Sequence, residues 1–163
     1  MPPEIQSYLE RINGARDQIR ALLESLPAND LPEILNWRPI EGKNDHATNS
    51  LGVLAVHTAG AEHFWIGEVI GGMPPTRDRD EEFRAEVLDL REILKQLDVV
   101  AAETRNVMEW LMPANLDEIR HVRGRDVSVR WIILHIIEHS ALHLGHMQLT
   151  YQLWVGGKTA ESP

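Results

Sequence analysis

Four of the protein's eight histidines lie within one short stretch, "WIILHIIEHSALHLGHMQL", residues 131–149. His135, His139 and His143 follow one another at intervals of four, and His146 comes three residues later. At about 100° per residue, all four fall within a sector of about 80° of one helix. Apolar residues flank this sector, so we expect it to face the protein interior. Unpartnered buried imidazoles are costly, whereas neutral imidazole is a good ligand for divalent metals, so the spacing favours a metal site.

A second stretch, "LGVLAVHTAGAEHFWIG", supplies a further histidine at position 57. An i, i+4 histidine pair places two nitrogens on adjacent turns, so a bundle needs only one more ligand from a facing helix. His57 lies near Ala55, Ala59 and Gly60, small residues that permit helices to approach closely. His63 lies about 120° further round the helix and is expected to point elsewhere. The alternative is that these histidines are ordinary core or interface residues.

Four segments with helical periodicity of apolar residues must position these histidines. The third is expected to open with a capping box, "DLRE", in which Glu92 reaches back to Asp89. Together they predict an all-α four-helix bundle in a single domain, residues 1–163, with long connections between helices one and two and between helices two and three. The segments run from Pro3 to Leu26, from Asn49 or Ser50 to Ile70 before a Gly71-Gly72 stop, from Asp89 to Leu111, and from Ser128 to Gly156-Gly157.

Composition narrows the range of partners. The 163 residues carry a net charge of −9, which disfavours nucleic acid and anionic membranes as partners. The basic stretch "RHVRGR", Arg120 to Arg125, is expected to be a solvated turn. We see neither a signal peptide nor an apolar run long enough to span a membrane, so a cytoplasmic location is expected. With no cysteine, the chain has no disulfide, thiolate ligand or cysteine nucleophile.

The histidine in the second helix, followed by "HIIEHSALHLGHMQL" in the fourth, resembles the DinB-like superfamily. That superfamily includes mycothiol-dependent maleylpyruvate isomerases and bacillithiol and mycothiol S-transferases. The likeness extends to "LNWRPIEGKNDHATNSLGVLAVHTAG" and so covers most of the chain. It implies a divalent metal held by His57, His139 and His143, with the pair His135/His139 as the second choice.

The resemblance departs from the common pattern after the last ligand. Many members have Arg-Gly-Gln there, whereas this chain has Leu144, Gly145 and His146. This variant resembles an actinobacterial-type branch, and the departure leaves the substrate open. Three imidazoles suit several ions, with zinc the first expectation and nickel, iron or manganese as alternatives.

Three protein ligands leave a coordination position open, as in catalytic rather than structural zinc sites. An ion with an open position can activate water or an incoming thiol, and any thiolate here must arrive with a small-molecule cosubstrate. The resemblance implies an S-transferase-like enzyme that activates a low-molecular-weight thiol, with hydrolysis as a variant. The alternatives are a non-catalytic metal- or small-ligand-binding stress-response bundle, and a structural bundle whose histidines line an interface.

The long connection before the second helix offers candidate substrate-binding residues. Trp37, Arg38 and Asn44 are expected at the rim of a pocket for a small-molecule substrate, where Arg38 can pair with a carboxylate. The alternative is that Trp37 plugs the end of the bundle and Arg38 faces water.

Three residues of the fourth helix are expected to support the metal ligands without binding the ion. His135 and His146 are expected to lie next to the ligands. Glu138 is a candidate base or orienting group. It lies about 100° from His139 on the helix, which favours a surface position instead.

The fourth helix has a wider apolar face than packing within one bundle normally needs. Its surplus includes Leu144, Tyr151 and Trp154. A two-fold homodimer through this face is expected, since it is the commonest oligomer. The alternative is that the long connections cover the face.

Overall fold

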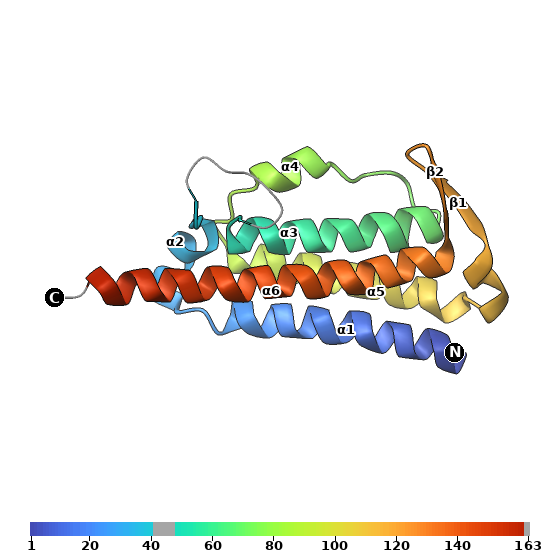
Figure 1. Ribbon diagram of the computed structural model, residues 1–163, viewed down its shortest axis with the longest axis horizontal. Coiled ribbons are helices and arrows are strands. Elements are labelled where there is room, and N and C mark those ends of the chain that lie inside the picture. Colours follow the sequence, from blue (N-terminus) through green and yellow to red (C-terminus); the bar gives the residue numbers. More distant parts are fainter. Residues whose placement is uncertain (41–47, 162–163) are drawn as a thin grey trace.

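A computed structural model describes residues 1–40 and 48–161 and forms a bundle of four long helices (Figure 1). Helices α1 and α3 each pack against both α5 and α6, so each long helix has two neighbours around a common core. The predicted all-α four-helix bundle is therefore confirmed. The long helices are α1 (Pro3–Glu24), α3 (Leu51–Glu62) with its π-helical continuation η2 (His63–Ile70), α5 (Leu90–Trp110) and α6 (Val129–Glu161).

Short elements occupy the connections between these helices. The two long connections predicted from the sequence are present, and each contains a short helix. The short elements are η1 (Ala28–Asp30), α2 (Leu31–Asn36), α4 (Arg79–Arg84), η3 (Pro113–Asp117), β1 (Ile119–Val122) and β2 (Arg125–Ser128). In Figure 1, α4 lies alongside α3 on the outer side of the bundle, and contacts between the two helices place them next to each other.

The helix ends follow capping chemistry. The Ser50 side chain accepts a hydrogen bond from the Val53 amide and starts α3, as predicted. Gly72, at a φ of +70°, lies just past the end of η2, where glycine adopts the left-handed conformation readily. Asp89 caps α5 by accepting from the Arg91 amide. The predicted reciprocal bond from Glu92 is not among the hydrogen bonds found for the described residues.

Of two predictions about the last third of the chain, one is incomplete and the other is wrong. The stretch around "RHVRGR" is not only a turn, because β1 and β2 pair there as an antiparallel hairpin closed by Arg123 and Gly124, both at positive φ. Four residues per strand are too few for alternation to stand out in the sequence. Helix α6 does not stop at Gly156-Gly157 but continues to Glu161. Neither glycine adopts the positive φ that ends a helix.

The bundle core consists of two apolar clusters with a polar layer between them. One cluster includes Ile12 and Ile136, and the other includes Ile19 and Leu144. The buried polar side chains of the layer come from all four long helices: Arg16, His57, Glu62, Thr104 and His143. Because burying polar groups is unfavourable unless they are partnered, this layer is where function is to be sought.

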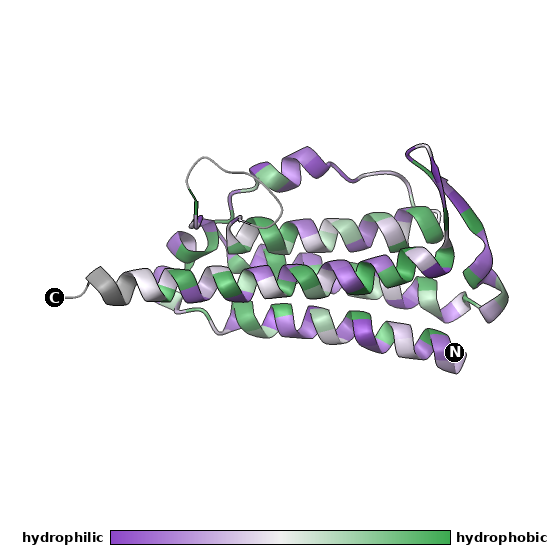
Figure 2. Cartoon of the chain, viewed as in Figure 1, coloured by the Kyte–Doolittle hydropathy of each residue, from purple (hydrophilic) through white to green (hydrophobic). Residues whose placement is uncertain are grey.

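The outward face of α6 carries exposed apolar residues among polar ones, and they differ from those predicted (Figure 2). Leu144 and Trp154 are buried in the chain's own core, and Tyr151 is half-buried against it. The exposed apolar residues of α6 include Leu142 and Leu149. A homodimer stays a prediction.

Among the described residues, no helix is long and apolar enough to cross a membrane.

Candidate metal centre

The polar layer brings the three predicted ligands together from two helices. His57 comes from α3, and His139 and His143 come from successive turns of α6. One nitrogen from each ring can be chosen so that all three lie within 4.8 Å of one another. The Nε2 atoms of His57 and His139 are 3.2 Å apart. Two nitrogens on one tetrahedral zinc ion would be about 3.3 Å apart, so the arrangement fits a divalent metal.

A carboxylate fixes the orientation of His57. Nδ1 of His57 lies 2.8 Å from Oε2 of Glu82, which belongs to α4. A carboxylate only accepts hydrogen bonds, so Nδ1 carries the proton and donates. In the neutral ring Nε2 then carries the lone pair, and this atom faces His139. Histidine ligands of metals commonly donate their second nitrogen to a carboxylate in this way.

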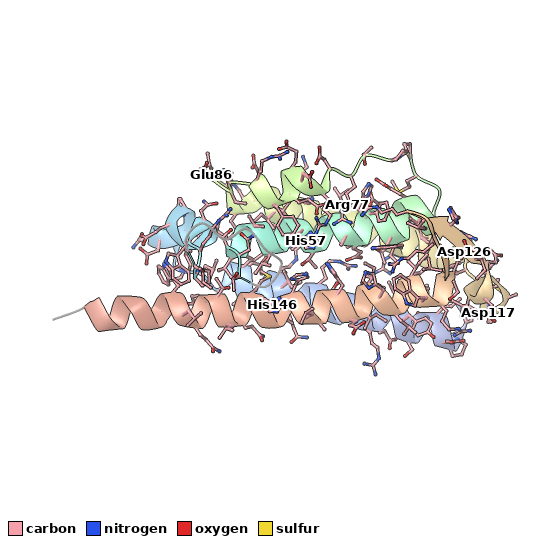
Figure 3. The ribbon with its side chains drawn as sticks, turned by 45° about the horizontal axis from the view of Figure 1, so that its top comes forward. His57, Arg77, Glu86, Asp117, Asp126 and His146 are labelled. Carbon is pink, nitrogen blue, oxygen red and sulfur yellow. The ribbon has the colours of Figure 1, made fainter. Side chains whose placement is uncertain are left out.

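Arg77 holds Glu82 in turn. Its Nε donates to Oε1 of Glu82 over 2.6 Å, and its Nη2 donates to Oε2 over 2.8 Å. Burial raises the pKa of Glu82, but the hydrogen bonds from Arg77 and His57 outweigh burial, so the pKa is lowered overall. Glu82 is therefore ionised at neutral pH. Figure 3 shows Arg77 and His57 next to each other where α4 meets α3, with Nη2 of Arg77 3.4 Å from Nδ1 of His57.

Gly60 makes room for this carboxylate. A Cβ atom at position 60 would overlap the carboxylate of Glu82. The small residues near His57 were expected to let helices approach closely, but at Gly60 the group that approaches is the side chain of Glu82.

His139 is held in an environment that keeps it neutral. Its Nδ1 is buried and, within the described part of the chain, has no hydrogen-bond partner. Burial, followed by the nearby His143 and His57 rings, lowers the pKa of His139 from 6.5 to about 2. The neutral ring is the form that binds a metal.

The other predicted residues of α6 lie around the three ligands. His146 places its Nδ1 3.4 Å from Nδ1 of His143. The His135 ring stacks on Trp131, with centroids 4.8 Å apart, and its pKa is lowered by burial and then by Arg125. Glu138 is exposed on α6. The supporting roles of His135, His146 and Glu138 remain predictions.

The structure does not gather the predicted rim residues around the histidines. Trp37 is half-buried and packs against the apolar cluster that contains Leu144. Arg38 lines a separate cavity of about 290 Å³ together with Glu86. Asn44 lies outside the described residues. Substrate binding by these three residues stays a prediction.

His63 points away from the centre, as expected. Its Nδ1 lies 2.7 Å from Glu103 and its Nε2 lies 2.9 Å from the Thr76 hydroxyl.

Glu82 and Arg77 are the two residues of the site that could not be predicted from the sequence. Their stretch, "RDRDEEFR", holds seven charged residues in no periodic pattern, so nothing in it singles out one carboxylate.

The pKa of His139 predicts how stability depends on pH. Between pH 6.5 and pH 2 the unfolded chain binds a proton at His139 that the folded, metal-free chain does not. The free energy of unfolding therefore falls as the pH drops below about 6.5, by up to about 1.4 kcal/mol per pH unit from this group. Denaturant unfolding in the presence of a chelator, from pH 7.5 to pH 5, measures this slope. His139→Gln should reduce the change in the free energy of unfolding per pH unit. If the variant and the unchanged protein showed the same pH dependence, the pKa of His139 would not be lowered in the folded chain.

Comparisons with known proteins give the family and the fold of this chain. The sequence model of the DinB superfamily matches residues 11–147, a range that contains all three histidines. The crystal structure of a conserved protein from Enterococcus faecalis is similar, with a TM-score of 0.73 and 15% identity, covering 96% of this chain and 99% of that chain. At this identity the likeness concerns the fold. A comparison with curated proteins gives no match. The chain belongs to the DinB superfamily.

Proposed function

We propose that this protein binds a divalent metal through His57, His139 and His143, and that it is an enzyme that activates a low-molecular-weight thiol or water. The observation that carries the proposal is the convergence of three imidazoles from two helices within 4.8 Å. Membership of the DinB superfamily is compatible with metal binding. Zinc is the first candidate, because three neutral nitrogens with an open position are typical of its catalytic sites.

The neighbouring residues suit this role. Glu82 and Arg77 hold His57 with Nε2 facing His139, and the lowered pKa of His139 keeps its ring neutral. A bound divalent ion would supply Lewis acidity, which lowers the pKa of a thiol or of water. The chain has no cysteine of its own, so a sulfur nucleophile would have to come from a small-molecule cosubstrate.

The proposal is tested with protein purified without a histidine tag, because a tag would bind metal itself. Elemental analysis is expected to find about one divalent ion per chain. Zinc-loaded protein is then mixed with a small thiol and chlorodinitrobenzene, and thioether formation is followed by absorbance. We expect turnover that depends on both thiol and metal. The His139→Ala variant is the control and should remove that turnover.

The outcomes separate the alternatives. The protein could contain about one metal ion per chain and yet catalyse neither the reaction of a thiol with chlorodinitrobenzene nor the hydrolysis of an ester. That result would favour the non-catalytic metal-binding protein. Protein that neither contains nor takes up metal would overturn the proposal and leave a structural bundle.

A further inference from the structure

The connection between η2 and α5, residues 71–89, reaches the candidate metal centre through Glu82. Helix α4 places the Glu82 carboxylate against Nδ1 of His57, on the side of the ring away from His139. The Phe83 ring, next along α4, lies 4.7 Å from the His57 ring between centroids. The orientation of His57 therefore depends on a segment that carries none of the three ligands.

The same connection is fastened to α3 and its continuation by further polar contacts. Oε1 of Glu68 accepts from the backbone amides of Thr76 and Arg77, over 2.7 and 3.0 Å. The Thr76 hydroxyl lies 2.9 Å from Nε2 of His63. His63 and Glu68 belong to the same continuous helical segment as His57. The connection thus forms a strap along the helix that supplies the first ligand.

Towards α5, the strap is not closely packed. A cavity of about 390 Å³ lies there, bordered by Thr76 and Arg77 of the strap and by Gln96 and Val100 of α5. Phe83 and Val87, both buried, anchor the later part of the strap in the core. Its earlier part, up to Arg77, is held to the helix by hydrogen bonds, and segments held in this way open more readily than the core. Arg77, which holds Glu82, belongs to this earlier part, so the contact between Glu82 and His57 depends on a part of the strap that opens more readily than the bundle core.

Contacts behind a ligand influence metal affinity. A carboxylate bonded to the second nitrogen of a histidine fixes its tautomer and orientation, and losing it typically lowers affinity by about 10- to 100-fold. Linkage is reciprocal, so whatever the strap adds to metal affinity, the metal adds to the stability of the closed strap.

We propose that Glu82, held by Arg77, is the positioning residue for His57, and that metal binding is thereby linked to closure of the strap over α3. This inference rests on the proposed metal-binding function. It assigns a regulatory role to residues 73–85, the middle of the strap. Any change that moves these residues away from α3 would lower metal affinity without changing any ligand.

Gly60→Ala tests the proposal without touching a ligand. The added Cβ overlaps the end of the Glu82 side chain, which is flexible enough to move away, and alanine favours the helix more than glycine does. We expect the zinc Kd, measured by competition with a chromophoric chelator, to rise about 10- to 100-fold. Gly14→Ala on α1 is the matched control. Its Cβ has no neighbour within 4 Å, so the Kd should not change.

Two further variants address Glu82 itself. In Glu82→Gln, a single carbonyl oxygen replaces two carboxylate oxygens that serve Arg77 and His57, so a rise in Kd of the same order is expected. Glu81→Gln changes the neighbouring residue of α4, whose exposed carboxylate pairs with Arg84, and should leave the Kd unchanged. Thermal melts of the metal-free variants check that each one folds.

Hydrogen exchange measures the linkage directly. Zinc should slow amide exchange in residues 73–85 of the unchanged protein, and should do so less in Gly60→Ala. If the unchanged protein binds zinc but Gly60→Ala and Glu82→Gln bind it within twofold as well, the positioning role is wrong. Unchanged exchange on adding zinc would overturn the linkage. Failure of the unchanged protein to bind zinc would instead overturn the proposed function.

Discussion

Replacing His57, His139 or His143 singly by alanine is expected to weaken zinc binding by about 100- to 1000-fold. A four-ligand zinc site has an apparent binding free energy of about 10–16 kcal/mol, or roughly 3–4 kcal/mol per ligand. That amount corresponds to two to three powers of ten in the dissociation constant. The three rings converge on one point, so each variant should show a loss of similar size. Competition titration of tag-free protein, with circular dichroism to confirm folding, provides the measurement.

Two other histidines make this experiment specific. His121→Ala removes an exposed ring of the hairpin, whose Nδ1 lies 2.8 Å from Asp126, and should leave zinc affinity unchanged. His135→Ala distinguishes the two possible pairs on α6. Its ring stacks on Trp131, and we expect a small effect. A large loss for His135→Ala, together with a small loss for His143→Ala, would show that His135 and His139 are the pair that binds the ion.

The sequence was sufficient for the features that depend on neighbours within one helix. Residues three or four apart share a face, so the apolar stripes identified the four long helices. The same rule placed His139 and His143 on adjacent turns facing His57. The capping serine at position 50 and the glycines at 71 and 72 were also readable, because these residue types have strong local preferences.

Features that depend on contacts between distant segments were not readable. Glu82 lies 25 residues from His57, in a short helix whose neighbours are also charged. Nothing in its local sequence distinguishes it from Glu81, which is exposed. The partnership of Arg16 and Glu62 spans 46 residues and was missed for the same reason. The glycines at 156 and 157 were misread, because glycine permits a helix to end but does not require it.

The polar layer of the bundle contains two clusters of polar side chains, and they differ in how their polar atoms are partnered. In one, Glu62 accepts from the Arg16 guanidinium and from the Thr104 hydroxyl, and Arg16 also donates to Asn13. Its charges are paired within the chain. In the other, the imidazoles of His57, His139 and His143 each bring one nitrogen within 4.8 Å of the other two. The first cluster is thus suited to joining α1, α3 and α5, and the second to holding a ligand.

Arg16→Met is accordingly expected to lower the free energy of unfolding by about 3–5 kcal/mol, because it leaves the Glu62 carboxylate buried without its cationic partner. Both side chains are at most 7% exposed.

Burial raises the pKa of Glu62 even against the opposing effect of Arg16, so without Arg16 the carboxyl should hold its proton to higher pH. The folded state of the variant then binds a proton that the unfolded state has lost, and its destabilisation should grow between pH 6 and pH 8.

The double variant Arg16→Met/Glu62→Met should recover most of the loss, since apolar side chains of similar volume can replace a buried ion pair. Arg20→Met on the same helix breaks a more exposed pair with Asp98 and should cost less than about 1 kcal/mol. Urea unfolding at both pH values measures all three variants, and a loss for Arg16→Met no larger than that for Arg20→Met would show that the pair does not join these helices.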